Sequence, residues 1–140
     1  MNYELITIPT ITVLLAQIIK LATDKTKGNL DIINILNKYG GMPSSHTSFV
    51  TSLGTLIALK EGFNSVAFAI WFVFSVIVIK NALGLRQEVS RHSVAIEKIA
   101  REKKVPIPQL THRLGHKPIE VIAGFFFGLT ITLIIKFLIN

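Results

Sequence analysis

Two segments of the chain each place a histidine at the start of an apolar stretch. Residues 40–47 read GGMPSSHT, and Pro43 suits the first turn of a helix. The hydroxyls of Ser44 and Ser45 lie beside the backbone N–H groups that a helix start leaves open, and such a start binds anions well. His46 could there donate a proton to a phosphate oxygen or a leaving group. Taken alone, the segment is equally typical of a helix cap that carries an interfacial histidine.

The second segment, residues 113–124, leads into the last apolar stretch and again has a histidine ahead of a proline. Glu120 follows His116 by four residues, so on a helix the two side chains would share a face. A carboxylate there holds the imidazole in one tautomer and raises its basicity, which prepares a histidine as a nucleophile. The alternative is a glutamate that the helix macrodipole favours at a helix start, with His116 an incidental interfacial residue.

Basic side chains near the two histidines could hold a phosphate. The connection between the segments contains Arg86 and Arg113, whose guanidinium groups suit phosphate oxygens. Lys20 ends an apolar stretch, where snorkelling explains it and phosphate contact is the alternative. His92 and His112 lie in polar stretches and are predicted as surface residues. No HxH, HExxH or aspartate-rich spacing occurs and cysteine is absent, so we expect no metal or other cofactor.

The composition indicates a membrane protein. Hydrophobic residues make up 50% of the 140, and only 16% are charged, against about 25% in ordinary soluble domains. The net charge of +7 comes mainly from residues that flank the apolar stretches, as is usual beside membrane helices. A nucleic-acid-binding protein would instead carry its basic residues on a soluble, folded face. We therefore expect a membrane environment and no nucleic-acid partner.

Four apolar stretches are predicted as membrane helices: residues 5–22, 46–59, 64–79 and 121–139. Each is near the lower edge of the roughly 17 to 25 residues that a spanning helix needs. The second is small and weakly polar, which suits a helix packed among other helices. Residues 23–41 could form an amphipathic surface helix, and residues 90–104 an exposed helix that the sequence VPIP ends.

The predicted fold class is therefore all-α. We expect one domain over residues 1–140, a small polytopic membrane helical bundle with about four membrane helices plus one or two interfacial or cytoplasmic helices. Four spans place both long hydrophilic stretches on the same side, which carries most of the Lys and Arg residues and is therefore predicted as cytoplasmic. The histidine site of this multi-pass protein of the cell membrane would face the cytoplasm. Four short helices enclose little volume, which favours a homodimer.

The two histidine segments resemble motifs of a known family. Residues 43–46, PSSH, resemble the Pro-Ser-Gly-His motif of the type-2 phosphatidic acid phosphatase superfamily, and residues 116–121, HKPIEV, resemble its final His-x-Pro-x-Asp-Val motif. The whole chain resembles more closely the short, divergent branch labelled acid phosphatase/vanadium-dependent haloperoxidase-related. That branch has Gly-Gly-Met-Pro-Ser-Ser-His, then Asp-Ala-x-Gly-Val-Arg-Arg, then Leu-Gly-His-x-Pro-x-Glu-Val. The middle element is NALGLRQ here, at residues 81–87.

The resemblance implies a role for each site residue. His116 would attack phosphorus to form a phosphohistidine, Glu120 would orient it, and His46 would protonate the leaving oxygen. Groups around Ser44 and Ser45, with Arg86 and Arg113, would stabilise the pentacoordinate transition state without a metal. The expected function is hydrolysis of a lipid phosphate or diphosphate at the cytoplasmic membrane face.

Several positions depart from the superfamily pattern. Its first motif, Lys-x6-Arg-Pro, is matched in spacing by Lys20 and Lys27, but Lys27 is not Arg. Leu110 stands where an Arg usually precedes the nucleophile by six residues, and Asn81 and Gln87 replace the Asp and second Arg of the closer branch. These departures favour the alternative function, a non-catalytic membrane protein that binds anionic phosphate headgroups. A small transporter subunit is a third interpretation, which ionisable residues within the spans would support, and the span at residues 64–79 contains none.

Overall fold

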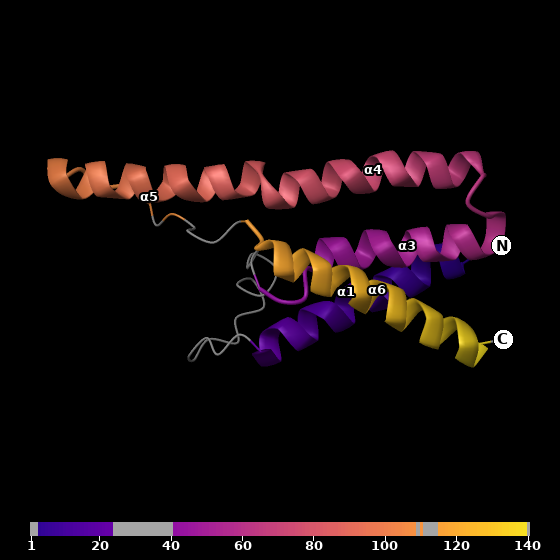
Figure 1. Cartoon of the computed structure of the whole chain (residues 1–140). Coiled ribbons are helices and arrows are strands. Elements are labelled where there is room, and N and C mark those ends of the chain that lie inside the picture. Colours follow the sequence, from indigo (N-terminus) through magenta and orange to yellow (C-terminus); the bar gives the residue numbers. More distant parts are fainter. Residues whose placement is uncertain (1–2, 24–40, 109, 111–114, 140) are drawn as a thin grey trace.

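The computed structural model describes residues 3–23, 41–108, 110 and 115–139, and all regular structure in these residues is helical. The helices are α1 (Glu4–Thr23), α3 (Ser45–Glu61), α4 (Val66–Leu83), α5 (Leu85–Lys103) and α6 (Pro118–Ile139) (Figure 1). The prediction of an all-α bundle is confirmed, and α1, α3, α4 and α6 match the four apolar stretches. The amphipathic helix predicted within residues 23–41 falls on residues 24–40, outside the described residues.

The four apolar helices run in alternating directions, so their connections gather at two ends of the bundle. Both termini and the α3–α4 turn lie at one end, and the starts of α3 and α6 lie at the other (Figure 1). Among the described residues, the helical segments 66–103 and Pro118–Ile139 are long and apolar enough to cross a membrane. They expose large apolar side chains such as Ile70, Val73 and Phe126, which lipid would cover. The chain is a small helical membrane bundle.

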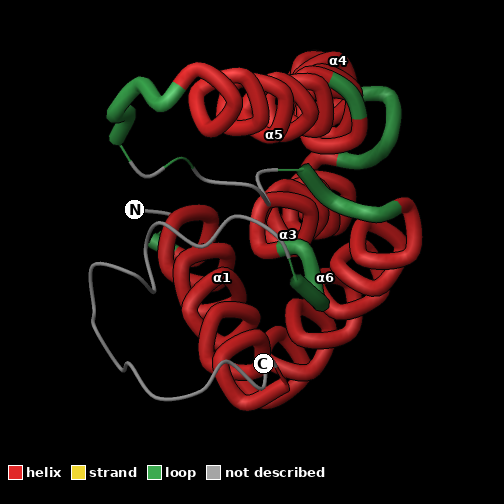
Figure 2. The backbone as a smooth tube through the Cα atoms, turned by 90° about the vertical axis from the view of Figure 1, so that its left-hand side faces the viewer, coloured by secondary structure: helices red, strands yellow, loops and turns green. Residues whose placement is uncertain are grey.

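α3 lies at the centre of this bundle, in contact with α1, α4 and α6 (Figure 2). It approaches α6 so closely that two positions of α6, one turn apart, have room only for glycine. A Cβ on Gly124 would lie 2.6 Å from the Ser44 carbonyl oxygen, and a Cβ on Gly128 would lie 2.5 Å from that of Ser48. Small residues at this spacing allow close packing and strong van der Waals contact between membrane helices. The two helices that begin at the histidine segments are thereby held together.

Buried hydroxyl groups join α3 to α1 and α6 farther along the bundle. Thr132 Oγ1 donates to Ser52 Oγ at 2.6 Å, and Ser52 Oγ lies 3.3 Å from Thr12 Oγ1. All three side chains are fully buried. Hydrogen bonds between membrane helices contribute about 0.6 kcal/mol each. The prediction that the weakly polar second stretch packs among other helices is confirmed.

α4 packs on α3 through an aromatic side chain and continues into α5. The indole ring of Trp71 lies against Gly54, where a Cβ would overlap it, and Trp71 Nε1 donates to the Val50 carbonyl oxygen at 2.6 Å. One residue separates α4 from α5, and the two helices form a rod that extends beyond the bundle (Figure 1). The exposed helix predicted for residues 90–104 is confirmed as part of α5, which ends before the VPIP sequence at 105–108.

A single carboxylate joins three helices at the end of the bundle remote from the histidines. Glu4 Oε2 accepts hydrogen bonds from Lys60 Nζ at 2.8 Å and from Lys136 Nζ at 3.2 Å. These groups are partly exposed, so water and salt screen the attraction and each pair contributes little to stability. The cluster nevertheless connects α1, α3 and α6 and offsets part of the positive charge at this end.

We expect Gly128→Ala to destabilise the bundle by about 1–3 kcal/mol, because the added methyl group would press on the Ser48 carbonyl, which is helix backbone and cannot rotate away. Thermal unfolding of the purified protein in detergent would show this loss as a lower midpoint. Thr130→Ala, at an exposed position of the same helix, is the control and should leave the midpoint unchanged. An unaltered midpoint in Gly128→Ala would contradict the close α3–α6 contact.

Candidate active site

A cavity of about 550 Å³ lies among α1, α3 and α4, where the end of α1 meets the start of α3. Its polar lining residues are Gln17, Lys20, Ser45, His46 and His116, and its apolar lining residues are Val13, Phe49, Val50, Phe74 and Val78. The structure therefore brings both histidines of the two sequence segments into one cavity, although they are 70 residues apart in the chain. Hydrophobic walls with a few convergent polar groups are typical of small-molecule sites.

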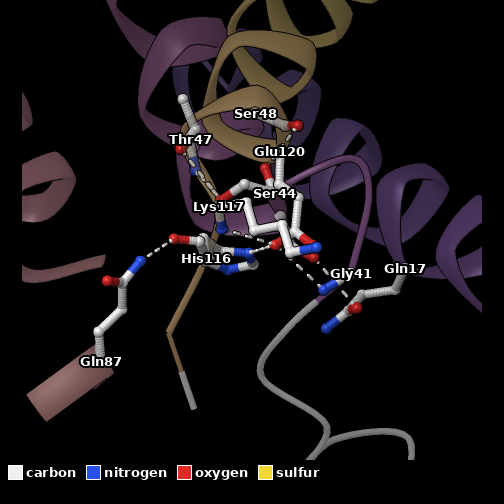
Figure 3. Close-up of polar contacts among 10 residues, drawn as sticks. Gln17, Gly41, Ser44, Thr47, Ser48, Gln87, His116, Lys117 and Glu120 are labelled. Carbon is white, nitrogen blue, oxygen red and sulfur yellow. Dashed lines mark hydrogen bonds and ion pairs between the residues drawn. The ribbon is translucent and has the colours of Figure 1, made fainter. Parts of the chain in front are cut away.

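The His116 ring is held by a carboxylate on the first turn of α6. His116 Nδ1 lies 2.8 Å from Glu120 Oε2, and the His116 side chain is only 1% exposed. The same oxygen accepts hydrogen bonds from the backbone N–H groups of Lys117 at 3.2 Å and Gly41 at 3.3 Å (Figure 3). With Nδ1 bonded to Glu120, Nε2 is the nitrogen of His116 that is left to act in the cavity.

The backbone of His116 is held from the other side by the α4–α5 junction. The His116 N–H donates to the Ala82 carbonyl oxygen at 3.1 Å, and the His116 carbonyl oxygen accepts from Gln87 Nε2 at 2.7 Å (Figure 3). Gly115 lies so close to Gln87 that a Cβ there would overlap the glutamine side chain. His116 thus lies in a non-helical segment before α6, yet its ring and both its backbone polar groups are held by hydrogen bonds.

The surroundings of His116 favour a neutral imidazole. Burial lowers the pKa of His116 below its ordinary value, and the hydrogen bond and charge of Glu120 oppose this effect only in part. The positive charges of Lys20 and Arg86 lower this pKa further. At pH 7 the ring is therefore neutral and can use the Nε2 lone pair as a nucleophile.

His46 lies on the first turn of α3 and lines the cavity together with His116. Its Nε2 is 3.5 Å from Arg86 NH2, a contact at the limit of hydrogen-bond distance. Arg86 belongs to the first turn of α5, so the α4–α5 junction brings a cation to this histidine as well as holding the backbone of His116. The predicted proximity of Arg86 to the two histidines is thus present in the structure.

Lys20 reaches the cavity by passing over a glycine. The Lys20 side chain is buried, with 5% exposure, and a Cβ on Gly41 would lie 2.9 Å from Lys20 Cε. Gly41 also has a φ of +111°, which side chains other than glycine rarely adopt. Gly41 therefore has two functions, since it leaves room for Lys20 and its backbone N–H donates to Glu120.

Ser44 and Ser45 have different positions although they are neighbours. Ser44 is the N-cap of α3: its Oγ accepts from the N–H and the Oγ1 of Thr47, and its own N–H donates to the Glu120 carbonyl oxygen. Ser44 is fully buried and is not among the residues that line the cavity, whereas Ser45 lines it. The expectation that Pro43 occupies the first turn of a helix is wrong, because the cap at Ser44 follows it.

Two glutamines complete the site, and sequence reasoning missed the first and noted the second only as a departure. Gln17 Oε1 accepts from Ser45 Oγ at 3.1 Å, and Gln17 lies three residues before Lys20 on α1, a spacing that could have indicated a shared face. Gln87 holds the His116 carbonyl. Arg113 and His112 lie outside the described residues. In the part of the chain that is described, no three His, Cys, Asp or Glu side chains are grouped to hold a metal ion.

We expect His116 to titrate below the ordinary histidine value of about 6.5, and Glu120→Gln to lower its pKa further, because the carboxylate is the group that favours the charged ring. Nitrogen-15 NMR of histidine-labelled protein in micelles measures this pKa. Glu102→Gln removes an exposed carboxylate of α5 and should leave the His116 pKa unchanged. A His116 pKa above 6.5 in the unmodified protein would contradict the neutral-ring assignment.

Comparisons with known proteins show which family the chain is similar to. A family model described as the Divergent PAP2 family matches residues 1–131, a range that contains both histidine segments and every cavity residue. The chain is 30% identical over 143 residues to the Uncharacterized membrane protein YuiD of Bacillus subtilis (strain 168), with 89% of each chain covered. No solved structure matches the chain. The chain belongs to the Divergent PAP2 family.

Proposed function

We propose that this protein is a membrane phosphatase that hydrolyses a lipid phosphate or diphosphate through a phosphohistidine at His116, without a metal. The observation that carries the proposal is the bond between His116 Nδ1 and Glu120 Oε2, which leaves a neutral Nε2 in a cavity shared with His46 and Lys20. A buried, oriented and neutral imidazole beside a second histidine is the arrangement that covalent phosphoryl transfer requires.

In the first step, His116 Nε2 attacks phosphorus and the bond from phosphorus to the leaving oxygen breaks. The negative charge of the bound phosphate favours the protonated form of His46, which donates its proton to that oxygen, so the alcohol or phosphate departs with a proton on it. The ring of His116 becomes positively charged as the new P–N bond forms, and the carboxylate of Glu120 stabilises this charge. Lys20 and Arg86 supply positive charge for the equatorial oxygens of the transition state.

In the second step, water attacks the phosphohistidine. His46, now neutral, accepts a proton from the water, the P–N bond breaks, and inorganic phosphate and neutral His116 are regenerated. Ser45 lines the same cavity, and its backbone N–H at the start of α3 can donate a hydrogen bond to a phosphate oxygen. Arg113, outside the described residues, remains a predicted further ligand, as does Ser44, whose hydroxyl serves the α3 cap.

The apolar half of the cavity supports a lipid rather than a soluble phosphate. Phe49 and Val50 of α3 and Phe74 and Val78 of α4 line it, and these helices lie in the membrane bundle. The site is at the end of the bundle that bears the long basic connections, whereas Glu4 offsets Lys60 and Lys136 at the other end. We infer from this asymmetry a multi-pass orientation with the site at the cytoplasmic face.

Purified protein in detergent is expected to release phosphate from a lipid phosphate in the presence of a chelator, and His116→Ala should reduce the rate to background because the nucleophile is lost. His92→Ala, exposed on α5, should retain the rate. Vanadate, which mimics the pentacoordinate transition state, should inhibit. Loss of activity in chelator would contradict metal independence.

Failure to release phosphate from phosphatidate, phosphatidylglycerophosphate and polyprenyl diphosphate would contradict catalysis. The alternative function, non-catalytic binding of anionic headgroups, would then hold if vesicles rich in such lipids still bound the protein through Lys20 and Arg86.

His46→Ala should lower kcat by about 10²–10⁴-fold for alkyl phosphates, since an alkoxide needs a proton to leave. The same variant should lower kcat much less for p-nitrophenyl phosphate, because p-nitrophenolate leaves without one. The ratio of the two kcat values, compared with the unmodified protein, measures this effect. An equal loss on both substrates would show that His46 does not act as the general acid.

A further inference from the structure

Along α1, the side chains that line the cavity change from charged to uncharged polar to apolar at successive turns of the helix. Lys20, Gln17 and Val13 are spaced by three and four residues and line it from one helix face. The opposite wall shows the same order, since His46 and Ser45 begin α3 and Phe49 and Val50 follow one turn later. A bound molecule would therefore meet cations first, then a neutral amide, and then apolar side chains.

Gln17 and Ser45 form the uncharged polar part of the cavity wall. Ser45 Oγ donates to Gln17 Oε1 at 3.1 Å, which orients the amide and leaves the two hydrogens of Nε2 for another acceptor. In the part of the chain that the structure describes, Ser45 is the hydrogen-bond partner of the Gln17 side chain. Gln17 is half-buried and lines the cavity, so its Nε2 group is accessible to a bound molecule.

We propose that Gln17 is a substrate-binding residue that recognises a hydrogen-bonding group on the alcohol, one or a few bonds from the phosphate ester. This inference rests on the proposed function. Gln17 and Lys20 are three residues apart, about 4.5 Å along the helix axis, a distance similar to that from a phosphorus atom to an oxygen on the second carbon of the alcohol. The alcohol that matches the cavity therefore carries a hydroxyl or ester carbonyl that accepts from Gln17 Nε2, with its hydrocarbon chain against Val13, Phe49 and Phe74.

A phosphate ester whose alcohol has no hydrogen-bonding group beside the ester is a poorer match for Gln17. A prenyl or plain alkyl chain would cover the Gln17 amide without accepting its hydrogen bond, and that desolvation is unfavourable. The phosphate itself has nearer donors in Lys20 and Ser45. Gln17 therefore distinguishes among alcohols and contributes little to holding the phosphate.

The test compares two phosphates that each have one hydrocarbon chain, lysophosphatidate and hexadecyl phosphate, presented in the same detergent micelles. Lysophosphatidate has a hydroxyl and an ester carbonyl near the phosphate ester, and hexadecyl phosphate has neither. The unmodified protein should show a kcat/KM for lysophosphatidate about tenfold higher. Gln17→Met keeps the side-chain size and removes the amide, so it should lower kcat/KM for lysophosphatidate about tenfold, mainly through KM. It should not lower kcat/KM for hexadecyl phosphate, because the desolvation of the amide no longer opposes binding of an alkyl chain. Ile18→Met, on the exposed face of α1, is the matched control and should retain the unmodified ratio.

The two substrates also separate the failure of this inference from the failure of the proposed function. If the unmodified protein hydrolyses both substrates equally, or if Gln17→Met reduces both to the same extent, Gln17 has only a structural role and the inference is wrong while the phosphatase stands. If the unmodified protein hydrolyses neither substrate nor any other lipid phosphate, the proposed function itself is overturned, and this inference with it.

Discussion

Three N–H donors converge on one oxygen of Glu120: the ring of His116 and the backbone amides of Lys117 and Gly41. A carboxylate that is 4% exposed is tolerated inside a protein only when hydrogen bonds replace the water it has lost. Because Gly41 belongs to the first histidine segment and Lys117 to the second, satisfying this one charge requires the two segments to meet. The bonds that stabilise the carboxylate also orient the histidine.

At the starts of α3 and α6, the contacts that pack the two helices together also set the geometry of the site. Gly124 lies against the Ser44 carbonyl, and the Ser44 N–H donates to the Glu120 carbonyl oxygen, so backbone contact begins at the level of the site and continues to Gly128. Any side chain on these glycines would separate the two helix starts and with them the two histidines. Small residues in this bundle therefore position the two histidines of the site as well as allowing helices to pack.

The α4–α5 junction supplies the third support of the site. Ala82 and Gln87 hold the backbone of His116, and Arg86 between them lies beside His46. Gln87, which replaces an arginine of the related branch, thus has a defined contact, because an amide donates to a carbonyl oxygen as an arginine would. Asn81, the other departure, is exposed, and the structure gives no reason for the change.

The sequence by itself determined the helices and the pairing of His116 with Glu120. Apolar length and a four-residue spacing are local properties, and local geometry carries them into the fold. Only the tertiary structure decided the surroundings of that pair, because they depend on contacts between helices that are distant in the chain. Lys20 reaches the histidines because Gly41 lacks a side chain, and Gln17 joins the cavity because α1 packs beside Ser45. The spacing of residues within one helix does not predict such contacts, because they form only when the helices pack together.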